Sequence, residues 1–573
     1  MTFKRLTSPS AGDSTHFGGL DVNKFSDYLG GTDISGSETI DINTLTAFRN
    51  SKLTLRNPAN TFSYTFVPSA IVAARNVTLP LLTGNDTLVA EAATQTLTNK
   101  TIAYGSNTIT GLPSGSTMIE PAQIIIYIDP ADSNKCKVQN SLTGATIRTS
   151  TDSSAANVTS TINTALSTDL TAGRTWKERA CFKGNFTLTK VTIPSYTIID
   201  LTGANIKQNN ATNDHLFVNS DTSGGNVQIE ICGGYIDGNK ANQTEESVDY
   251  AIRNAIAMIK VTDLKIHDLR QENSNANGIF IDSTSSQIEI NNCMIKTCAK
   301  IAIYIRSVGA DVKSRARISN CYLDSPEENF LITERCEDVI FEHNNCFNSG
   351  TTGLNLCGKR AVINGNTLDT CATSMIVSGT EGDANWICSG SKITNNIITN
   401  VEQYGILLGT NDALTDVIIS GNSLSPNATT TSASSTGIRL TAAKRCAISH
   451  NNITGFRRNG IMLDGFAGGW PCDQNVVNGN VIWDNGKDTG AAAESRSGIY
   501  ATSDVAGHNN RNLICNNRIY DTAGTSGTQS YGISYKNTTG IFLHGNSVTG
   551  NDVGTINSIS GNTSATDADN QIT

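Results

Sequence analysis

Two groups of carboxyl-bearing residues in the chain have the types that acid–base chemistry on a sugar requires. In the first group Asp282, Arg306 and Glu334 each follow a short apolar run. If those runs are strands on successive turns of one rod, the two carboxyl groups stand about 10 Å apart at the backbone. Such a separation suits an inverting pair, in which one carboxyl protonates the leaving oxygen and the other activates water. The alternative, which we favour, is an Asp-Arg-Glu charge ladder on a solvated edge.

The second group lies in the loop LDGFAGGWPCDQN, residues 463–475, which contains Asp464, Trp470 and Asp473. A Trp ring offers a sugar-stacking platform, and the Gly pair allows a lid to move. The basic pair 457–458, one turn away, could hold an acidic sugar. Equally, Trp470 could only anchor the loop to the body of the protein.

A repeated signature determines what positions these residues. Six residues recur with the pattern apolar, any, Asn/Gly/His, Asn/Cys/Gly, any, apolar. Most copies are 22 to 37 residues apart: ICGGYI (231), INNCMI (290), ISNCYL (318), FEHNNC (341), INGNTL (363), ITNNII (393), ISGNSL (419), ISHNNI (448), VNGNVI (477), ICNNRI (514), LHGNSV (543) and ISGNTS (559). Between copies stands a Gly followed by alternating apolar residues, as in GIFI (278), GILL (405) and GIML (460). Three short strands per repeat predict a parallel β-helix of about 12 to 14 turns.

The fourth position of the signature is most often Asn. Stacked at one corner of the rod, these side chains are expected to bond to one another and to the backbone of the bend. Cys293 and Cys321 stand at that position in two early turns. We therefore interpret the column as structural, with Asn at 344, 366, 396, 422, 451, 480, 517, 546 and 562.

Composition narrows the classes of partner. The net charge of -9 and the pI near 5.4 disfavour nucleic acid and anionic membranes. The chain has no run of about 18 apolar residues, so no membrane span is predicted. The first residues lack the apolar core of a signal peptide. The 14 Cys show neither a CxxC pair nor a Cys/His spacing typical of zinc, so we expect no metal and no cofactor.

Three regions follow from these patterns. Residues 1–120 have no Asn-turn signature and are expected to form a small β-rich region. Residues 121–170 are expected to form a linker and a helix over 161–172 that caps the core. Residues 171–573 are expected to form the β-helix, so the fold class is all-β.

This repeat resembles the pectin-lyase-like superfamily of right-handed β-helices over about 170–573. RNVTLPLLTGNDTLV (75–89) and TLTNKTI (96–102) also look like segments of tail-fibre and spike proteins from viruses of bacteria and archaea. The resemblance implies a virion protein, made without a signal peptide. Its N-terminal region would attach to other tail or baseplate proteins, and its β-helix, usually a trimer, would bind or cut host-surface glycan.

Within that superfamily, the stretch around residue 280 is most similar to polygalacturonases. The acids of that family fall on Asn277, Cys298 and Ala299 of this chain. An amide, a thiol and a methyl group cannot supply the two carboxyls that the inverting mechanism needs. The resemblance therefore excludes standard polygalacturonase activity, and the catalytic candidates are Asp282, Glu334, Asp464 and Asp473.

The superfamily's ligand groove follows the Gly-Ile strand. Strand alternation predicts its outward column as Phe280, Tyr304, Leu331, Asn355, Ile376, Leu407, Arg439, Met462, Tyr500 and Ser534. A column this apolar is expected to be shielded from solvent. The chain's own loops, a partner subunit or stacked sugar rings could shield it. The substrate-binding candidates are Phe280, Tyr304, Arg306, Arg439, Trp470 and Tyr500.

We thus expect a homotrimeric virion spike or tail fibre that recognises host polysaccharide, without nucleic acid binding or membrane insertion. Three alternatives stay open. The protein could also depolymerise the glycan as a hydrolase or lyase. It could be a non-enzymatic structural or adaptor protein of the particle. It could be a secreted β-helix hydrolase or lyase unrelated to a virus.

Overall fold

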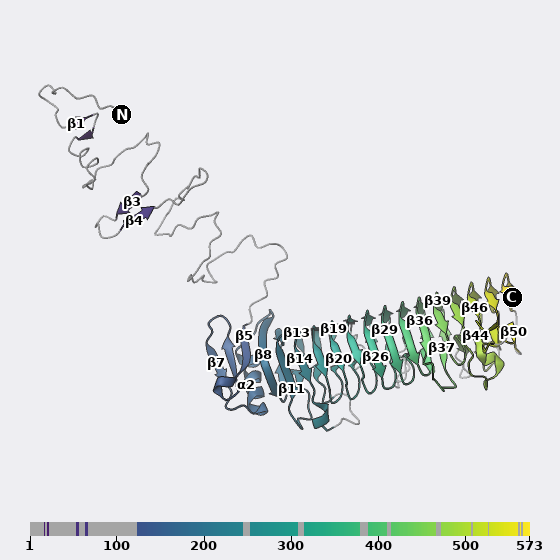
Figure 1. Cartoon of the computed structure of the whole chain (residues 1–573), viewed down its shortest axis with the longest axis horizontal. Coiled ribbons are helices and arrows are strands. Elements are labelled where there is room, and N and C mark those ends of the chain that lie inside the picture. The colour runs from purple at the N-terminus through teal and green to yellow at the C-terminus, as the bar shows by residue number, and fades with distance from the viewer. Residues whose placement is uncertain are drawn as a thin grey trace. The chain divides into compact units, whose positions relative to one another are not determined.

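The computed structural model describes residues 123–244, 252–282, 284–307, 315–378, 388–409, 414–465, 471–505, 508–524, 527–559, 562 and 565–572, and four short strands nearer the N-terminus (Figure 1). The chain divides into a unit of residues 1–112 and a unit of residues 113–573. The first unit contains two antiparallel pairs, β1 (His16–Phe17) with β2 (Leu20–Asp21) and β3 (Leu53–Arg56) with β4 (Ser63–Phe66). The rest of the expected attachment region lies outside the described residues. No helix in the described ranges has the length and apolar character needed to cross a bilayer.

The second unit is a parallel β-helix in which each turn contributes one strand to each of three sheets. Sheet I precedes the Asn turn and consists of β5 (Ile124–Asp129), β6 (Lys135–Asn140), β7 (Thr146–Thr149), β8 (Glu178–Leu188), β10 (Thr197–Asp200), β13 (Asn226–Cys232), β16 (Val261–His267), β19 (Ser286–Asn291), β22 (Ala316–Ser319), β25 (Ile340–Glu342), β28 (Val362–Asn364), β31 (Lys392–Thr394), β35 (Ile418–Ser420), β39 (Ala447–Ser449), β42 (Val476–Asn478), β45 (Leu513–Cys515), β48 (Phe542–His544) and β51 (Thr566–Ala568).

Sheet II follows the Asn turn. It begins with the second half of β8 and continues with β11 (Ala204–Gln208), β14 (Tyr235–Asp237), β17 (Arg270–Glu272), β20 (Met294–Lys296), β23 (Tyr322–Asp324), β26 (Asn345–Ser349), β29 (Thr367–Cys371), β32 (Ile397–Val401), β36 (Ser423–Pro426), β40 (Asn452–Thr454), β43 (Val481–Trp483), β46 (Arg518–Tyr520), β49 (Ser547–Thr549) and β52 (Gln571–Ile572).

Sheet III is formed by the Gly-Ile strands and has 14 strands in chain order. These are β9 (Val191–Ile193), β12 (Phe217–Asn219), β15 (Ile256–Ile259), β18 (Ile279–Asp282), β21 (Ile303–Arg306), β24 (Leu331–Glu337), β27 (Leu354–Lys359), β30 (Ile376–Ser378), β33 (Tyr404–Leu408), β37 (Thr436–Thr441), β41 (Ile461–Gly465), β44 (Ser497–Ser503), β47 (Tyr531–Lys536) and β50 (Gly554–Ser558). A short parallel pair, β34 (Leu414–Thr415) with β38 (Ala443–Lys444), lies beside the three sheets. The expected all-β parallel β-helix is confirmed.

The Asn column forms as predicted, with one correction. Each fourth-position Asn donates its side-chain N–H to the amide oxygen of the Asn on the next turn, as Asn451 does to Asn480 at 3.0 Å. The column runs through Asn at 344, 366, 396, 422, 451, 480, 517, 546 and 570, and all but the last are buried. Asn570 is its last member, and the prediction of Asn562 was wrong because ISGNTS follows a strand of sheet III. Asn562 instead accepts a hydrogen bond from the backbone of Thr538.

The left-handed residue of the bend is the third of the signature and not the fourth. Asn292, Asn320 and His450 at that position have φ of 52°, 56° and 55°. Asn and Gly tolerate this backbone region better than other residues. The fourth side chain is thereby free to point inward and to bond along the axis.

Apolar columns from all three sheets fill the core, including Ile279, Ile303 and Leu331 in register on sheet III. Leu331 and Ile376 were predicted to face outward, and this was wrong. Their outward neighbours are Ile332 and Val377, since the apolar runs there begin one residue earlier in the register.

The glycines that open these strands are needed for close packing between turns. A Cβ atom on Gly460, for example, would lie 2.5 Å from Ile482 Cγ2.

The helix α2 (Ala155–Thr168) packs on β8 and β9, and Val158, Ile162 and Leu166 are among its buried residues. It begins earlier than the expected 161–172 because Ser154 caps it, accepting a hydrogen bond from the Asn157 N–H. The segment 121–170 also contains β5, β6 and β7, and β5 pairs with β8. Short 3-10 helices lie at Pro130–Asp132, Lys240–Asn242 and Ala493–Arg496.

Candidate functional site

The first predicted carboxyl group lies in an ion-paired cluster on the outer face of sheet III. Arg306 donates to both oxygens of Asp282, from Nε at 3.0 Å and from Nη2 at 2.8 Å. These hydrogen bonds raise the pKa of the guanidinium. Glu334, on the next turn, accepts a hydrogen bond from the Tyr304 hydroxyl at 2.5 Å. The predicted Asp-Arg-Glu ladder thus forms only in part: Asp282 is paired with Arg306 but is buried and not on a solvated edge, and Glu334 is bonded to a tyrosine hydroxyl.

The aromatic side chains beside this cluster are buried. Phe280 is fully buried and Tyr304 is 4% exposed, and their ring centroids are 5.4 Å apart. The Arg306 guanidinium lies over the Phe280 ring at 5.4 Å. In this structure the chain covers both rings, so a sugar ring cannot stack on them.

The second predicted group is divided between two places. Asp464 on β41 forms an ion pair with Arg439 on β37, whose Nη1 also donates to the Tyr404 hydroxyl at 2.9 Å. Asp473 instead accepts a hydrogen bond from the backbone N–H of Asn510 at 2.8 Å. The two carboxylates therefore serve separate contacts.

Of the remaining predicted binding residues, Tyr500 is 7% exposed and lies in register with Met462 on sheet III. Burial raises the pKa of its hydroxyl. Trp470 lies outside the described residues.

The positions that correspond to the polygalacturonase acids are structural. Asn277 is fully buried, and its side chain donates to Asn254 Oδ1 at 2.8 Å and accepts from the Ile301 N–H. Cys298 and Ala299 are also fully buried. Nothing at these three positions can reach a substrate.

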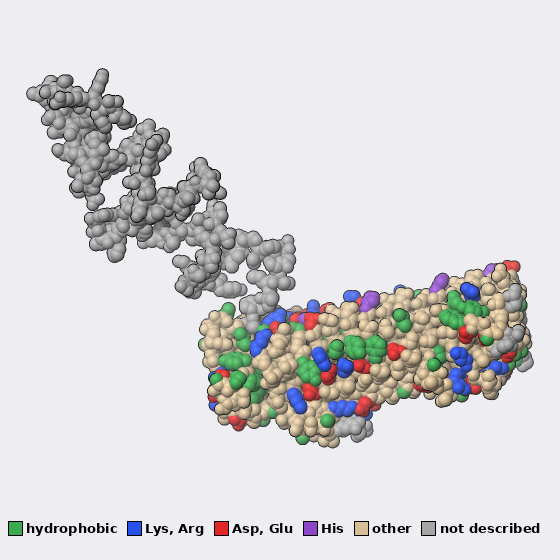
Figure 2. Space-filling view, viewed as in Figure 1, with side chains coloured by type: hydrophobic (Ala, Val, Ile, Leu, Met, Phe, Trp, Pro, Cys, Tyr) green, Lys and Arg blue, Asp and Glu red, His purple; other side chains and the backbone are tan. Residues whose placement is uncertain are grey.

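An outward-facing row that the sequence analysis did not single out runs along sheet II. Aromatic rings on this row are half-buried, and cations pack on three of them. Arg270 lies 5.3 Å from the Tyr235 centroid, Lys296 Nζ lies 5.8 Å from the Tyr322 centroid, and Arg518 lies 4.9 Å from the Tyr520 centroid. Figure 2 shows hydrophobic and charged side chains gathered on the face along which Figure 1 labels β14, β20 and β26.

The row has two aromatic groups. Tyr322 packs against Phe347 at 5.5 Å in the N-terminal half of the rod. Trp483 and Tyr520 stack at 6.1 Å with an interplanar angle of 7° near the other end. The two groups are six turns apart, or about 29 Å at one strand spacing per turn. A long polymer lying along the rod can contact both.

A groove of about 300 Å³ lies beside the first aromatic group, at the corner between sheets I and II. We call it the corner groove. Its sheet II wall consists of Arg270, Met294 and Tyr322, and its turn wall includes Asp268, Asn292 and Asn320. Met294 is 36% exposed. The groove therefore combines apolar surface with amides and charges, which is the usual composition of a small-ligand site.

A second groove, of about 340 Å³, contains Arg457, as the sequence analysis expected for an acidic sugar, together with Lys487, Asn427 and Thr430. Arg457 forms an ion pair with Asp488 at 3.2 Å. Lys487 is exposed. This groove has the charge to attract an anionic group.

A row of apolar side chains on sheet I is also open to solvent. Ile418, Val476 and Phe542 stand in one outward column and are 39%, 36% and 44% exposed. Ile340, Val362, Ala447 and Leu513 belong to the same column, which Lys392 interrupts between Val362 and Ile418. From Ile418 to Phe542 the column is apolar at five successive turns.

Sequence reasoning placed the binding surface on the strand that the resemblance favoured, and therefore overlooked sheet II. One signal was present, since Tyr235, Tyr322 and Trp483 each occur within two residues of the second apolar residue of a signature copy. In each copy the aromatic residue is next to an Ile or Leu that faces the core, so strand alternation places the aromatic side chain on the outer face.

Comparison with known proteins defines the class of this β-helix. The family described as "Right handed beta helix region" matches residues 254–424 and 382–572, together more than half of the chain. The chain belongs to this right-handed β-helix family, and the sheets are therefore wound right-handed. No curated protein sequence matches it.

Solved structures share the fold at low identity. The pre-mature gene product 12 of bacteriophage phi29 is 15% identical with a TM-score of 0.50, covering 68% of this chain and 53% of that one. A mutant tailspike protein of E. coli bacteriophage HK620, in complex with a pentasaccharide, is 12% identical with a TM-score of 0.48, covering 71% and 76%. The A-module of the Azotobacter vinelandii mannuronan C-5 epimerase AlgE4 is 11% identical with a TM-score of 0.38, covering 73% and 96%. At these identities the likeness concerns the fold alone.

Proposed function

We propose that this chain is a subunit of a virion spike or tail fibre that binds a host cell-surface polysaccharide along sheet II. The observation that carries the proposal is the corner groove, where Tyr322 and Met294 lie beside Arg270 on rigid strands. Aromatic faces stack on the C–H faces of sugars, and neighbouring amides and charges bond to hydroxyl groups. Asn292 and Asn320 stand in the opposite wall and supply such amides.

The repeat adds a reason for a polymeric ligand. Equivalent outward positions recur at each turn, so successive sugar units meet successive strand ends as the polymer follows the axis. The Trp483–Tyr520 pair lies in the same outward face and supplies a distant second contact.

The proposal is for binding and not for cleavage. Asp282 and Asp464 are ion-paired with Arg306 and Arg439, and Glu334 is bonded to Tyr304. An acid that protonates a leaving group must be available to the substrate. The contacts of these carboxylates favour structural roles.

The virion role is supported by likeness. Gene product 12 of bacteriophage phi29 shares the fold at a TM-score of 0.50. The N-terminal stretch RNVTLPLLTGNDTLV also resembles segments of such proteins.

We further propose a homotrimer whose seam is the apolar row on sheet I. The uninterrupted apolar part of the row spans five turns from Ile418 to Phe542, about 19 Å along the axis. The sequence analysis had offered the Gly-Ile column as a seam, but Phe280 and Tyr304 on that column are already covered within one chain. An exposed apolar strip that follows the axis of a rod can be buried against other copies of the same chain.

Purified full-length chain applied to an array of neutral and acidic bacterial and archaeal envelope polysaccharides tests the proposal. Reducing ends and unsaturated uronate are measured in parallel on the same glycans. We expect retained binding without product. Release of product would overturn the binding-only proposal and favour a depolymerase, and failure to bind any glycan would favour a structural adaptor.

A further inference from the structure

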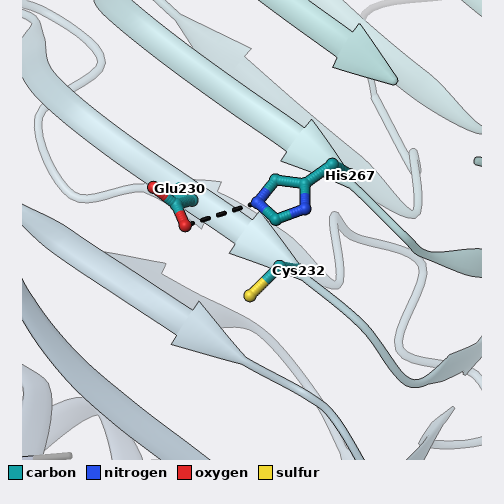
Figure 3. Close-up of side chains that lie close together, drawn as sticks. All are labelled: Glu230, Cys232 and His267. Atoms are coloured by element: carbon teal, nitrogen blue, oxygen red, sulfur yellow. Dashed lines mark hydrogen bonds and ion pairs between the residues drawn. The ribbon is translucent and has the colours of Figure 1, made fainter. Parts of the chain in front are cut away.

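Three side chains of metal-ligating type meet on the outer face of sheet I, near the capped end of the rod. Glu230 and Cys232 lie on β13, and His267 lies on β16, where it is the register partner of Cys232. Since alternate residues of a strand share a face, all three point outward together. Their ligand atoms lie within 4.8 Å of one another, and Figure 3 shows the side chains converging from the two strands.

Asp268 orients the histidine. Its Oδ2 lies 2.7 Å from His267 Nδ1, and the Asn292 side chain donates to its Oδ1 at 2.6 Å. His267 Nε2 is thereby directed toward Glu230 Oε1, 3.3 Å away. Histidines that bind metals almost always have this arrangement, with the second ring nitrogen held by a carboxylate or carbonyl.

Two basic side chains, Lys177 and Arg179, border the cluster, and Arg179 also interacts with the Cys232 thiol. Lys177 forms an ion pair with Glu230 at Oε2, at 3.0 Å, whereas Oε1 faces the histidine. Arg179 is paired with Asp200, one turn before Cys232. Cys232 is 6% exposed, while Glu230 and His267 are half-buried. The cluster is therefore sheltered but open to solvent on one side.

We propose that Glu230, Cys232 and His267 bind one Zn²⁺ ion, with a fourth position open to solvent. One oxygen, one sulfur and one imidazole nitrogen suit Zn²⁺, and a thiolate ligand disfavours Mg²⁺ and Ca²⁺. Tetrahedral coordination at bonds of about 2.0–2.3 Å requires ligand atoms roughly 3.5 Å apart. Glu230 Oε1 and His267 Nε2 are already 3.3 Å apart, so rotation of the Cys232 side chain must bring its sulfur, which lies within 4.8 Å of both, closer to them.

The chain contains its own matched control. Cys515 on β45 and His544 on β48 repeat the Cys–His register pair in the same outward column. Leu513 stands there in the place that Glu230 occupies beside Cys232. Since the second pair has no carboxylate at that place, we assign zinc binding to the first pair alone.

Cobalt titration of the full-length chain, stripped of metal with a chelator and kept reduced, tests the assignment. We expect one Co²⁺ per chain, displaced by Zn²⁺, with the visible bands of a tetrahedral site and a thiolate charge-transfer band. Cys232→Ser should remove the charge-transfer band, and His267→Ala should abolish stoichiometric binding. Asp268→Asn, which changes only the orienting contact, should weaken Co²⁺ binding roughly 10- to 100-fold.

Cys515→Ser and His544→Ala are the controls and should bind Co²⁺ as the unmodified chain does. An unchanged far-UV circular dichroism spectrum confirms that each variant is folded. The assignment is overturned if the unmodified chain shows no thiolate band, if Cys232→Ser retains it, or if Cys515→Ser loses it equally. These readouts do not involve glycan, so they stand apart from the test of the proposed function.

Discussion

Arg306 and Asp282 form a two-point ion pair across successive turns of sheet III, with Nε and Nη2 each donating to one carboxylate oxygen. The pair is shielded, since the two side chains are 28% and 11% exposed. Asp282 therefore has a structural role, because it holds the Arg306 guanidinium over the Phe280 ring. Its first consequence concerns stability.

Replacing Arg306 with Ala should lower the free energy of unfolding by about 2 kcal/mol, a value reduced from that of fully buried pairs because solvent reaches the guanidinium. Urea denaturation followed by circular dichroism measures the change. Arg445, which makes the same two-point contact with Asp416 at the exposed surface, is the control, and Arg445→Ala should change stability far less. Equal effects of the two substitutions would show that shielding does not strengthen the Arg306 pair.

The Asn column should be sensitive at each internal position. Asn451→Ala removes a side chain that donates to Asn480 Oδ1 and the Ile419 carbonyl and accepts from Asn422. Because buried partners lose their hydrogen bonds, we expect a loss of about 2–4 kcal/mol in unfolding free energy. Asn452→Ala, at the adjacent exposed position, should be nearly neutral, and a comparable loss there would contradict the role of the column.

Tyr322→Ala should weaken polysaccharide binding about tenfold, or ~1.4 kcal/mol, because a stacking surface is lost from the corner groove. Tyr322→Phe should retain most of the affinity, since the ring remains. Trp176, an exposed ring in the loop between α2 and β8, supplies the control variant Trp176→Ala. Surface plasmon resonance on immobilised glycan distinguishes the three. Unchanged affinity for Tyr322→Ala would remove the corner groove from the binding surface.

Val476→Lys should dissociate the proposed trimer by placing a charge in the middle of the uninterrupted apolar part of the row, from Ile418 to Phe542. Light scattering coupled to size exclusion should give three chain masses for the unmodified protein and fewer for the variant. Ser423→Lys on sheet II is the matched substitution at an exposed strand position and should leave the mass unchanged. A monomeric unmodified protein would refute the seam.

The thiols should differ in reactivity according to burial. Burial raises the pKa of Cys298 to about 12, and it raises that of Cys181, which is half-buried, to about 11. Thiolate is the reactive form. Peptide mass spectrometry after brief iodoacetamide treatment should therefore find Cys181 modified before Cys298, and the reverse order would contradict the burial of Cys298.

Part of the candidate site could be anticipated from sequence. The pairing of Asp282 with Arg306 was predicted, because residues at the same point of successive repeats lie next to each other when the repeats stack. The zinc cluster was not predicted, because Cys232 and His267 are separated by a loop whose length no motif records. Only the pairing of β13 with β16 makes them neighbours.

The sequence by itself determined the fold class and the Asn column. Both depend on a local pattern repeated many times, in which alternation assigns each residue to the core or the surface and stacking brings like residues together. Only the tertiary structure decided which surface is open. Phe280 and Asn355 share one outward column of sheet III, yet neither is exposed, whereas Met294 and Phe542 on the other sheets are. Burial of an outward side chain depends on which loops pack over it. These loops differ in length and sequence from turn to turn, so their positions cannot be predicted from the repeat.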